Sequence, residues 1–338
     1  MNTLTISPNW VGDTVLSIPV FDSLAASGRT VTVLARRHLE PLLNLVPSVS
    51  SVLVHGESGQ ETLQRVRRLE FDEAVVLPNS FRSALLPYRA GIGSRWGYRA
   101  RSIESVMRSL ILEPAVARPD HEKKHQVEDY AALLEAMGVD PPTPWIPRID
   151  LSPAAVADGT ALFERAGLHP ARGPVVGLFP GAEFGPSKRW PWRRFVELSR
   201  FLRHARPSSR QTILAGPKEL WLAVRIHEET GKFHPVIGPD LDLGRLAHAI
   251  SKLDLLVTND SGPMHLAAAL DVPCLALFGP TDPSRTRPVG QQHVVMYTDR
   301  WCSPCFRRRC PLIHHRCLRE LTADRVGKQA LEMLNQRE

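Results

Sequence analysis

Residues 253–265 read LDLLVTNDSGPMH, and this stretch decides the class of fold. The apolar run at 253–257 is typical of a strand buried in a parallel sheet. A polar turn follows, with Ser261 placed to cap a helix that has Pro263 in its first turn. Such a junction presents free backbone N–H groups at the carboxyl edge of a sheet, where phosphates and other anions bind. An ordinary turn without a ligand is the alternative, but polar side chains, His265 among them, crowd this one.

Apolar runs alternate with helical patterns along the whole chain. The strand-like runs lie at residues 4–7, 31–35, 51–54, 74–77, 175–180, 212–215, 235–238, 253–257, 274–278 and 294–297. This alternation predicts an α/β fold with parallel sheets, and its occurrence in both halves predicts two doubly wound domains. We expect an N-terminal domain at 1–165, a Gly- and Pro-rich join, a second domain at 174–321 and an amphipathic C-terminal helix at 322–338.

Composition is that of a globular protein outside the membrane. The 338 residues are 43% hydrophobic and 23% charged. No apolar run approaches the roughly 20 residues that a membrane span needs, and the first residues show no basic segment followed by an apolar one, as a signal peptide would. We therefore expect a cytoplasmic protein, in which the five cysteines do not form structural disulfides.

The net charge of +7 and the sequence pI of about 9.4 suit an acidic partner, such as a nucleic acid, a phosphorylated substrate or an anionic membrane. Arginines concentrate in residues 82–108, interleaved with tyrosine and tryptophan. They are Arg82, Arg89, Arg95, Arg99, Arg101 and Arg108. The cluster indicates an anion-binding surface, although an ordinary solvated face would explain any one of these side chains.

Two further junctions carry polar groups where a strand meets a helix. Near the N-terminus, Gly12 permits a tight turn and Asp13 lies beside the start of the next helix. Its carboxylate suits a general base, although spacing alone favours a plain helix cap. In the second half, the glycine-rich turn after residues 175–180 carries Lys188 and Arg189, two cations that suit a diphosphate. A surface turn is the alternative there.

Two motifs are misleading. The glycines at 91–97 miss the dinucleotide-binding spacing by one residue and lack its strand and helix. Residues 121–125 read HEKKH and match the zinc-protease pattern, but two lysines inside it would place positive charge beside a dication. A solvated helix start explains them better, with Lys124 and His125 facing a substrate anion.

The junctions together carry a family resemblance. WVGD at 10–13, PGAEFGPSKRWP at 180–191, NDSGPMHLAAAL at 259–270 and FGPTDPSRTRP at 278–288 resemble the ADP-heptose:lipopolysaccharide heptosyltransferases of glycosyltransferase family 9. The cysteine-rich C-terminal stretch is most similar to the heptosyltransferase II branch. The resemblance implies a GT-B fold, in which two Rossmann-like domains face a central cleft, the first binding the acceptor and the second binding the donor.

The resemblance also implies roles for individual residues. Asp13 is the catalytic base, and Arg95, Arg99, Arg101, Lys124 and His125 are expected to meet the anionic acceptor. The donor-binding residues implied in the second domain are Lys188, Glu219, Leu241, Leu243, Asp260, Ser261, Gly262 and His265. Glu183 and Phe184 stand where some family members have threonines, so contacts at these two positions are not carried over.

The implied reaction is an inverting transfer of heptose from ADP-heptose to the inner core of lipopolysaccharide, at the cytoplasmic leaflet of the inner membrane. It requires no cofactor, since Lys188 and the helix start at 261–264 neutralise the leaving diphosphate without a metal. The enzyme would be peripheral to the membrane and would bind no nucleic acid. The alternatives are a GT-B enzyme with another nucleotide-sugar donor, or a basic nucleic-acid-binding protein with a zinc knuckle.

Four cysteines lie close together near the C-terminus, at Cys302, Cys305, Cys310 and Cys317. Thiols at such spacing in a reducing compartment are typical of a tetrahedral structural zinc site. Free thiols on a loop are the alternative. A zinc ion here would hold the loop before the C-terminal helix and take no part in catalysis.

Overall fold

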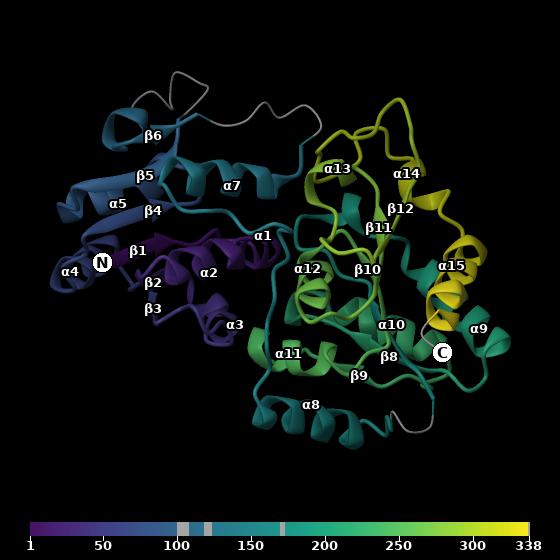
Figure 1. Ribbon diagram of the computed structural model, residues 1–338. Helices are drawn as coiled ribbons and strands as arrows, with labels where there is room; N and C mark the ends of the chain where they lie inside the picture. The colour runs from purple at the N-terminus through teal and green to yellow at the C-terminus, as the bar shows by residue number, and fades with distance from the viewer. Residues whose placement is uncertain (100–107, 118–123, 170–172, 337–338) are drawn as a thin grey trace. The chain divides into compact units, whose positions relative to one another are not determined.

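In the computed structural model, residues 1–99, 108–117, 124–169 and 173–336 are described (Figure 1). The chain divides into two compact units, Met1–Pro147 and Arg148–Glu338. Each unit contains a parallel sheet, so the predicted α/β class with two doubly wound units is confirmed.

The first unit is built on a six-stranded parallel sheet with the order β3-β2-β1-β4-β5-β6. Its strands are β1 (Asn2–Ile6), β2 (Thr30–Ala35), β3 (Ser51–Val54), β4 (Glu73–Val76), β5 (Ser94–Tyr98) and β6 (Ala115–Val116). Its described helices are α1 (Val11–Leu16), α2 (Ile18–Ala26), η1 (Arg37–Leu39), α3 (Glu40–Leu43), α4 (Gly59–Arg68), α5 (Phe81–Ala90) and α7 (Gln126–Ala136). The central strands are buried because helices cover both faces, which is why they are almost continuously apolar.

The second unit repeats this plan with the order β12-β11-β10-β7-β8-β9, again all parallel. Its strands are β7 (Val175–Phe179), β8 (Arg210–Leu214), β9 (Val236–Ile237), β10 (Leu255–Asn259), β11 (Cys274–Phe278) and β12 (Val294–Tyr297). Its helices are α8 (Pro153–Arg165), η3 (Pro186–Lys188), α9 (Trp192–Ala205), η4 (Pro217–Glu219), α10 (Leu220–Glu229), α11 (Leu243–Ile250), α12 (Gly262–Ala269), α13 (Pro283–Thr286), α14 (Arg316–Arg319) and α15 (Ala323–Asn335).

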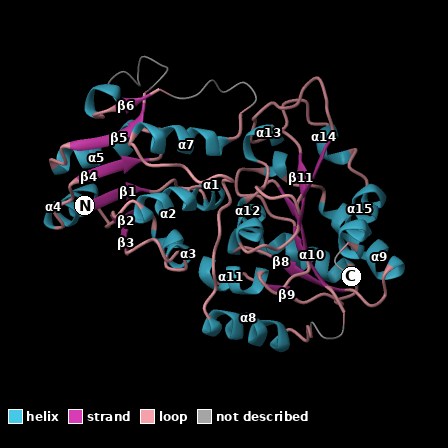
Figure 2. Cartoon of the chain, viewed as in Figure 1, coloured by secondary structure: helices cyan, strands magenta, loops and turns pink. Residues whose placement is uncertain are grey.

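Helices cover the second sheet in two layers (Figure 2). On one side α9 packs against both α10 and α15, and on the other α11 packs against both α8 and α12. The core on the first side is centred on Trp190, which is 1% exposed, meets Phe195 edge to face and donates its indole N–H to the carbonyl of Leu321. The predicted amphipathic C-terminal helix is present as α15 and buries Val326 and Met333 in this core.

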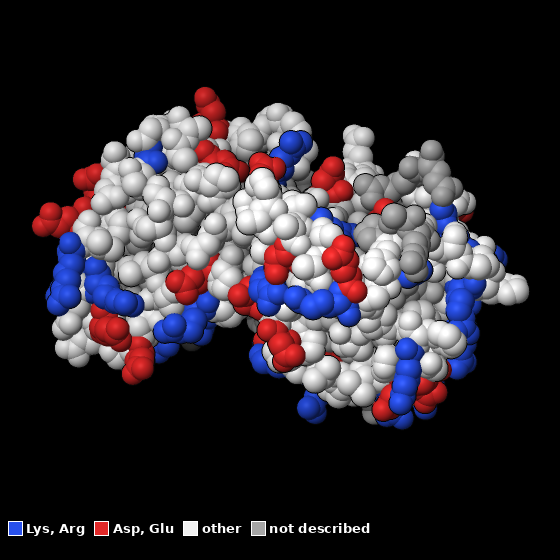
Figure 3. Space-filling model, turned by 90° about the horizontal axis from the view of Figure 1, so that it is seen from below, with Lys and Arg blue, Asp and Glu red and all other residues white. Residues whose placement is uncertain are grey.

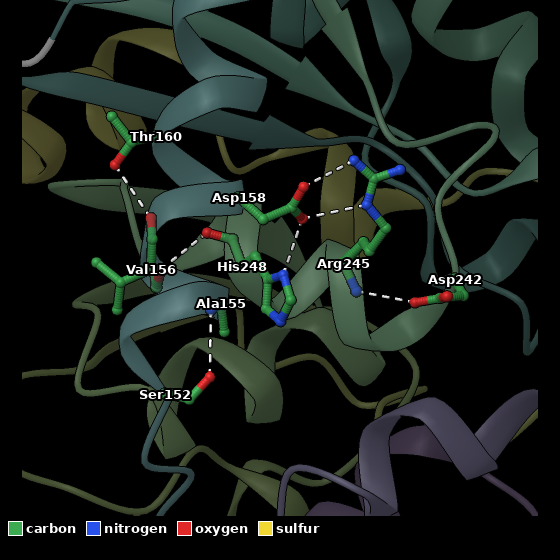
Figure 4. A network of polar contacts seen from close by, with 9 residues as sticks. Ser152, Ala155, Val156, Asp158, Thr160, Asp242, Arg245 and His248 are labelled. Carbon is green, nitrogen blue, oxygen red and sulfur yellow. Dashed lines mark hydrogen bonds and ion pairs between the residues drawn. The ribbon is translucent and has the colours of Figure 1, made fainter.

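Helix α8 packs with the second unit, although the sequence suggested that residues 1–165 form the first domain. Figure 4 shows the reason: Asp158 accepts hydrogen bonds from Arg245 and His248 of α11, at 2.9 Å to Arg245 Nη2 and 2.9 Å to His248 Nδ1. At Gly159 the backbones approach so closely that a Cβ atom would lie 2.4 Å from the carbonyl oxygen of His248. The Gly- and Pro-rich join expected from composition therefore follows a helix that tertiary contacts assign to the second unit.

No helix within the described ranges is both long enough and apolar enough to cross a lipid bilayer.

Asp158→Asn should destabilise the second unit, because the amide loses the charged hydrogen bonds to Arg245 and His248. These bonds lower the pKa of the Asp158 carboxyl from 3.8 to about 2. A lowered pKa stabilises the folded state above pH 3.8, and the stabilisation is lost as the pH falls towards 2. We expect a loss of about 1 kcal/mol at pH 7, since the pair is partly solvated.

Urea unfolding of Asp158→Asn and of Asp150→Asn, which replaces an exposed aspartate of the same unit, provides the measurement. The gap between Asp158→Asn and the parent protein should be smaller at pH 3 than at pH 7. An equal gap at both pH values would show that the charge of Asp158 contributes nothing.

Candidate active site

The carboxyl ends of β7 and β10 lie side by side in the centre of the second sheet. In both units the strand order, counted from the unit's first strand, is 3-2-1-4-5-6. The connections from the first and fourth strands of such a sheet leave in opposite directions, which opens a crevice at the carboxyl edge where ligands bind. In the second unit this crevice lies between β7 and β10. The two turns that carry the predicted donor-binding residues, at 180–191 and 260–265, follow these strands directly.

Lys188 and Asp260 meet at this edge. The Lys188 ammonium lies 2.5 Å from Asp260 Oδ2, and the two side chains are only 14% and 6% exposed. The hydroxyl of Thr281, in the turn after β11, donates to the same carboxylate oxygen at 2.5 Å. The ammonium also lies over the ring of Phe184, 4.9 Å from its centroid. A lysine held this way presents a fixed positive charge beside a helix start, which suits a phosphate group.

Asn259 joins the two turns. It is fully buried at the end of β10, and its amide nitrogen donates to the carbonyls of Pro180 and Gly181 at 2.8 and 3.1 Å. Its amide oxygen accepts from the backbone N–H of Trp190 at 2.9 Å. One side chain thereby satisfies three backbone groups at the two ends of the 180–190 turn, which fixes the position of Lys188 within it.

Helix α12 begins at Gly262, with Ser261 in the N-cap position, as the sequence predicts. The Ser261 hydroxyl does not cap the helix; it lies 3.2 Å from the hydroxyl of Thr258 instead. The Ser261 side chain therefore takes up no backbone donor at the start of the helix; Pro263 has no N–H, and the N–H of Met264 donates to the carbonyl of Ser261 at 3.1 Å. His265 lies one turn further on and is 6% exposed. The predicted donor contacts of Ser261, Gly262 and His265 stay predictions.

The neighbouring turns carry the other residues that were expected to bind the donor. Glu219 ends η4 after β8, is 6% exposed, and forms an ion pair with Arg189 at 3.2 Å. Burial raises the pKa of the Glu219 carboxyl, against the opposing effect of the Arg189 charge. Leu241 and Leu243 are half-buried in the turn after β9, where α11 begins. All three residues thus follow strands that end at the same edge of the sheet, because the strands are parallel.

Asp13 lies after the first strand of the first unit, as the 180–191 turn lies after the first strand of the second unit. It belongs to the first turn of α1, which follows β1. Trp10 occupies the N-cap position of this helix, so the interpretation of Asp13 as the cap is wrong. Gln126, at the start of α7, donates to Asp13 Oδ1 at 3.1 Å and to the hydroxyl of Tyr130 at 3.0 Å. This partly buried carboxylate accepts a hydrogen bond from a neutral amide, which orients it without supplying a proton, so the arrangement suits a general base.

Two arginines of the 82–108 cluster are internal, so the expectation of one anion-binding surface is wrong for them. Arg95 is 9% exposed and donates to the carbonyls of Ile92, Gly93 and Ile111. Arg108 is 2% exposed and donates to the carbonyls of Tyr98 and Pro78. The guanidinium groups of both residues thus donate to backbone carbonyls. Arginines buried in this way stabilise the loops around β5 and do not face an acceptor substrate.

The four remaining residues expected at the acceptor lie in different settings. Arg99 follows β5 and is exposed, whereas Arg101 lies outside the described residues. Lys124 forms an exposed ion pair with Glu128 at 3.5 Å. His125 is the N-cap of α7, where Nδ1 accepts from the backbone N–H of Val127 at 3.3 Å. His125 therefore positions α7, the helix that supplies Gln126 to Asp13.

The four clustered cysteines are free thiols, each of intermediate exposure. Within the described part of the chain, no group of three or more histidine, cysteine, aspartate or glutamate side chains converges in a way that could hold a metal ion. Burial is the main cause of a raised pKa for the Cys317 thiol. The zinc site at these cysteines stays a prediction, and zinc would require their sulfurs to move closer together.

Sequence reasoning missed the structural part of the site. Thr281 and Asn259 both lie inside quoted motifs, but their side chains act on residues 21 and 79 positions away. Arg308 was also missed: it lies over the Phe184 ring at 5.6 Å, on which Lys188 also lies. The one feature of the sequence that pointed to this contact is Phe184 itself, an aromatic residue where some family members have a threonine.

Comparison with known proteins identifies the arrangement. Residues 60–315 match the model of "Glycosyltransferase family 9 (heptosyltransferase)". The chain is 30% identical to lipopolysaccharide heptosyltransferase 2 of Escherichia coli K12, over 100% of both proteins, and 30% identical to lipooligosaccharide heptosyltransferase 2 of Haemophilus ducreyi, over 99% of both.

Solved structures agree with this similarity. The structure of E. coli ADP-heptose lipopolysaccharide heptosyltransferase II matches 100% of this chain and 99% of its own, with a TM-score of 0.82 and 29% identity. A family 9 glycosyltransferase from Veillonella parvula shares the fold, with a TM-score of 0.85 and 22% identity over 99% of this chain and 97% of its own. The two doubly wound units are therefore those of the predicted GT-B fold.

Asn259→Ala should destabilise the second unit, because three buried backbone groups lose their partner. Buried unsatisfied groups cost about 1–3 kcal/mol each, and partial relaxation leaves an expected loss of about 3 kcal/mol. In a unit of this size that corresponds to a fall in Tm of roughly 6–12 °C by scanning calorimetry. Asn79→Ala, at an exposed position, is the control and should leave Tm unchanged. Equal Tm values for both variants would show that Asn259 does not hold the turns together.

Proposed function

Since the chain belongs to glycosyltransferase family 9, we propose that it transfers heptose from ADP-heptose to the inner core of lipopolysaccharide, with inversion at the anomeric carbon. The observation that carries the proposal is the Lys188–Asp260 pair beside the start of α12, at the carboxyl edge of a Rossmann-like sheet. The full-length similarity to heptosyltransferase 2 enzymes supports this donor and acceptor.

In the proposed reaction, the Asp13 carboxylate takes the proton of the acceptor hydroxyl. The hydroxyl oxygen forms a bond to the anomeric carbon as the bond between that carbon and the β-phosphate oxygen breaks, and ADP leaves. A positioned base typically contributes about 10²–10⁴-fold to the rate. Gln126 keeps the carboxylate oriented by its hydrogen bond to Oδ1.

The departing diphosphate needs positive charge, which Lys188 and the start of α12 supply in this proposal. In the structure Lys188 is paired with Asp260, so a bound phosphate would share or replace that partner. The half-buried Leu241 and Leu243 are suited to pack against the adenine, and the buried Glu219 to accept from the ribose. The protein would act at the cytoplasmic leaflet of the inner membrane, as a peripheral enzyme.

A donor screen tests this proposal against a GT-B enzyme with another donor. ADP-heptose at 100 times its Kd should stabilise the protein by about 2.7 kcal/mol in a thermal-shift assay, whereas sugar nucleotides of uridine and guanosine should not. If one of those nucleotides stabilised the protein and ADP-heptose did not, that nucleotide sugar would be the donor instead of ADP-heptose. Salt-dependent binding of DNA or RNA without any effect of nucleotide sugars would instead support a nucleic-acid-binding protein.

Asp13→Asn should remove most turnover while leaving ADP-heptose binding unchanged, because an amide cannot accept the proton of the acceptor. We expect a loss of about 10²–10⁴-fold in kcat. Asp140→Asn, at an exposed position of the same unit, is the control. Turnover of Asp13→Asn within about threefold of the parent enzyme would exclude Asp13 as the base.

Lys188→Ala should weaken ADP and ADP-heptose to a similar degree, because the lost contact is to phosphate. A charge-assisted hydrogen bond is worth about 1.5–3 kcal/mol, or about 10- to 150-fold in Kd by titration calorimetry. Lys328→Ala removes an exposed lysine of the same unit and should have no effect. Because Lys188→Ala also leaves Asp260 buried without this cation, the double variant Lys188→Ala/Asp260→Asn should regain stability without regaining affinity.

Chelation separates the two roles considered for a metal. EDTA treatment should leave catalysis intact, since the proposed charge neutralisation uses Lys188 and α12. If EDTA abolished activity and Mg²⁺ restored it, the metal-free mechanism would be wrong. A structural zinc at Cys302, Cys305, Cys310 and Cys317 would appear as about one zinc per chain in elemental analysis, and occupancy well below half excludes it.

A further inference from the structure

Residues 300–319 form a basic segment that connects β12 to α14 and includes α14 itself. Its sequence, RWCSPCFRRRCPLIHHRCLR, contains arginines at 300, 307, 308, 309, 316 and 319 and no aspartate or glutamate. On the face displayed in Figure 3, by contrast, acidic and basic side chains are interspersed. The positive charge of the 300–319 segment is therefore a local feature.

Large apolar side chains protrude from the same segment. Trp301 is 87% exposed and Ile313 is 81% exposed, more than any other large hydrophobic residue in the described ranges, and Phe306 and Leu312 are 56% and 44% exposed. Single exposed apolar residues are common, but four within 13 positions of one short segment indicate a surface that is covered in use.

The backbone of the segment is fixed to the second unit. The N–H groups of Cys305 and Phe306 donate to the carbonyl of Pro280 at 3.0 and 2.8 Å. Ser187 donates to two carbonyls, from its hydroxyl to Arg307 at 2.5 Å and from its N–H to Arg308 at 3.3 Å. The exposed side chains are thus displayed from a held backbone and do not belong to a free tail.

The backbone conformation at two of the exposed residues is strained. Phe306 and Ile313 have φ angles of 54° and 59°, in the left-handed region that glycine favours. A β-branched residue such as isoleucine is rare there because its Cβ substituents crowd the backbone. The fold therefore maintains a strained backbone at two residues whose side chains are exposed.

Part of the positive charge is not neutralised by the protein. Arg300 pairs with Glu320, and Arg308 lies over the Phe184 ring. Arg307 and Arg309 form no ion pair with any residue that the structure describes. Two exposed arginines on either side of Arg308, between Phe306 and Ile313 in the chain, are arranged to meet anions next to an apolar phase.

We propose that the 300–319 segment docks on the surface of an anionic lipid bilayer. Trp301, Phe306 and Ile313 would enter the interface between headgroups and acyl chains, where tryptophan is favoured, while Arg307 and Arg309 would bind lipid phosphates. A nucleic acid also offers phosphates, but the aliphatic Ile313 and Leu312 gain nothing from contact with a sugar-phosphate backbone. This proposal does not depend on the identity of the donor, since it concerns attachment and not transfer.

Vesicle sedimentation with the full chain tests the proposal. The protein should bind vesicles of phosphatidylcholine with 30% phosphatidylglycerol and bind pure phosphatidylcholine much more weakly, about fivefold for each arginine engaged. Arg307→Gln/Arg309→Gln should therefore lower the affinity for anionic vesicles about 25-fold. The control Arg65→Gln/Arg68→Gln removes two exposed arginines of α4 and should have no effect.

The apolar part of the surface has its own test. Trp301→Ser/Ile313→Ser should weaken vesicle binding by roughly tenfold, from the apolar area that no longer leaves water. Trp221→Ser, at a tryptophan of α10 that is 54% exposed, is the control. Brominated lipids should quench part of the protein fluorescence, and Trp301→Phe should remove that part. Circular dichroism should show all variants folded, since the substituted side chains are exposed.

Equal vesicle binding by the parent protein and both 300–319 double variants would overturn the proposal. The proposal would also be overturned if the parent protein bound DNA but not vesicles and both double variants lost the DNA binding. The partner of the segment would then be a nucleic acid. A concentration-dependent dimer that Trp301→Ser/Ile313→Ser dissociates, without vesicle binding by the parent, would show that a second copy of the chain covers the segment.

Discussion

The parallel pairing of β7 with β10 is the constraint on which the donor side of this protein depends. Leu178 pairs with Val257 and Phe179 with Thr258, so the turns that begin at Pro180 and Asp260 start next to each other. Parallel strands must be joined by crossovers, which is why the two turns are about 80 residues apart in the chain and adjacent in space. The ion pair between Lys188 and Asp260 follows from this adjacency.

Buried polar groups make that edge specific. Asn259 satisfies backbone groups of one turn, and Thr281 donates to the carboxylate that receives Lys188. A buried ion pair and amide contribute little net stability when complete but are costly when one partner is removed. The main effect of the Lys188–Asp260 pair and the Asn259 amide is therefore to select one conformation of the turn, and their net contribution to stability is small. A transferase benefits from such rigidity because positive charge must be in place before the leaving group departs.

The basic character of the chain has more than one structural meaning. Arg95 and Arg108 satisfy internal carbonyls, Arg245 holds α8 against α11, and only some arginines remain available for anions. Net charge alone therefore overstates the basic surface of the first unit. The 300–319 segment differs, because uncompensated arginines there accompany exposed aromatic and aliphatic side chains on a held backbone.

Local sequence was sufficient to predict what depends on neighbouring residues. The strands other than β5 and β6, the start of α12 at Ser261, the face of α15 and the placement of polar residues after β1, β7 and β10 all follow from periodicity, capping and turn chemistry. Strands β5 and β6 were missed, since Ser94–Tyr98 carries arginine, tryptophan and glycine in place of an apolar run and Ala115–Val116 is only two residues long. The family motifs then supplied the roles of Asp13 and Lys188, since the identity of a catalytic group depends on a substrate that the chain does not contain.

Only the tertiary structure decided which polar side chains meet. That Lys188 pairs with Asp260, that Gln126 orients Asp13 and that His125 caps α7 depend on contacts across elements far apart in the chain. The same holds for the boundary between the units, because α8 has its partner in α11 and not in the residues beside it. Burial likewise separated Arg95 from the exposed Arg99, two similar residues four positions apart on one segment. Sequence patterns report the preferences of each segment, whereas pairing across a fold is set by the packing of all segments together.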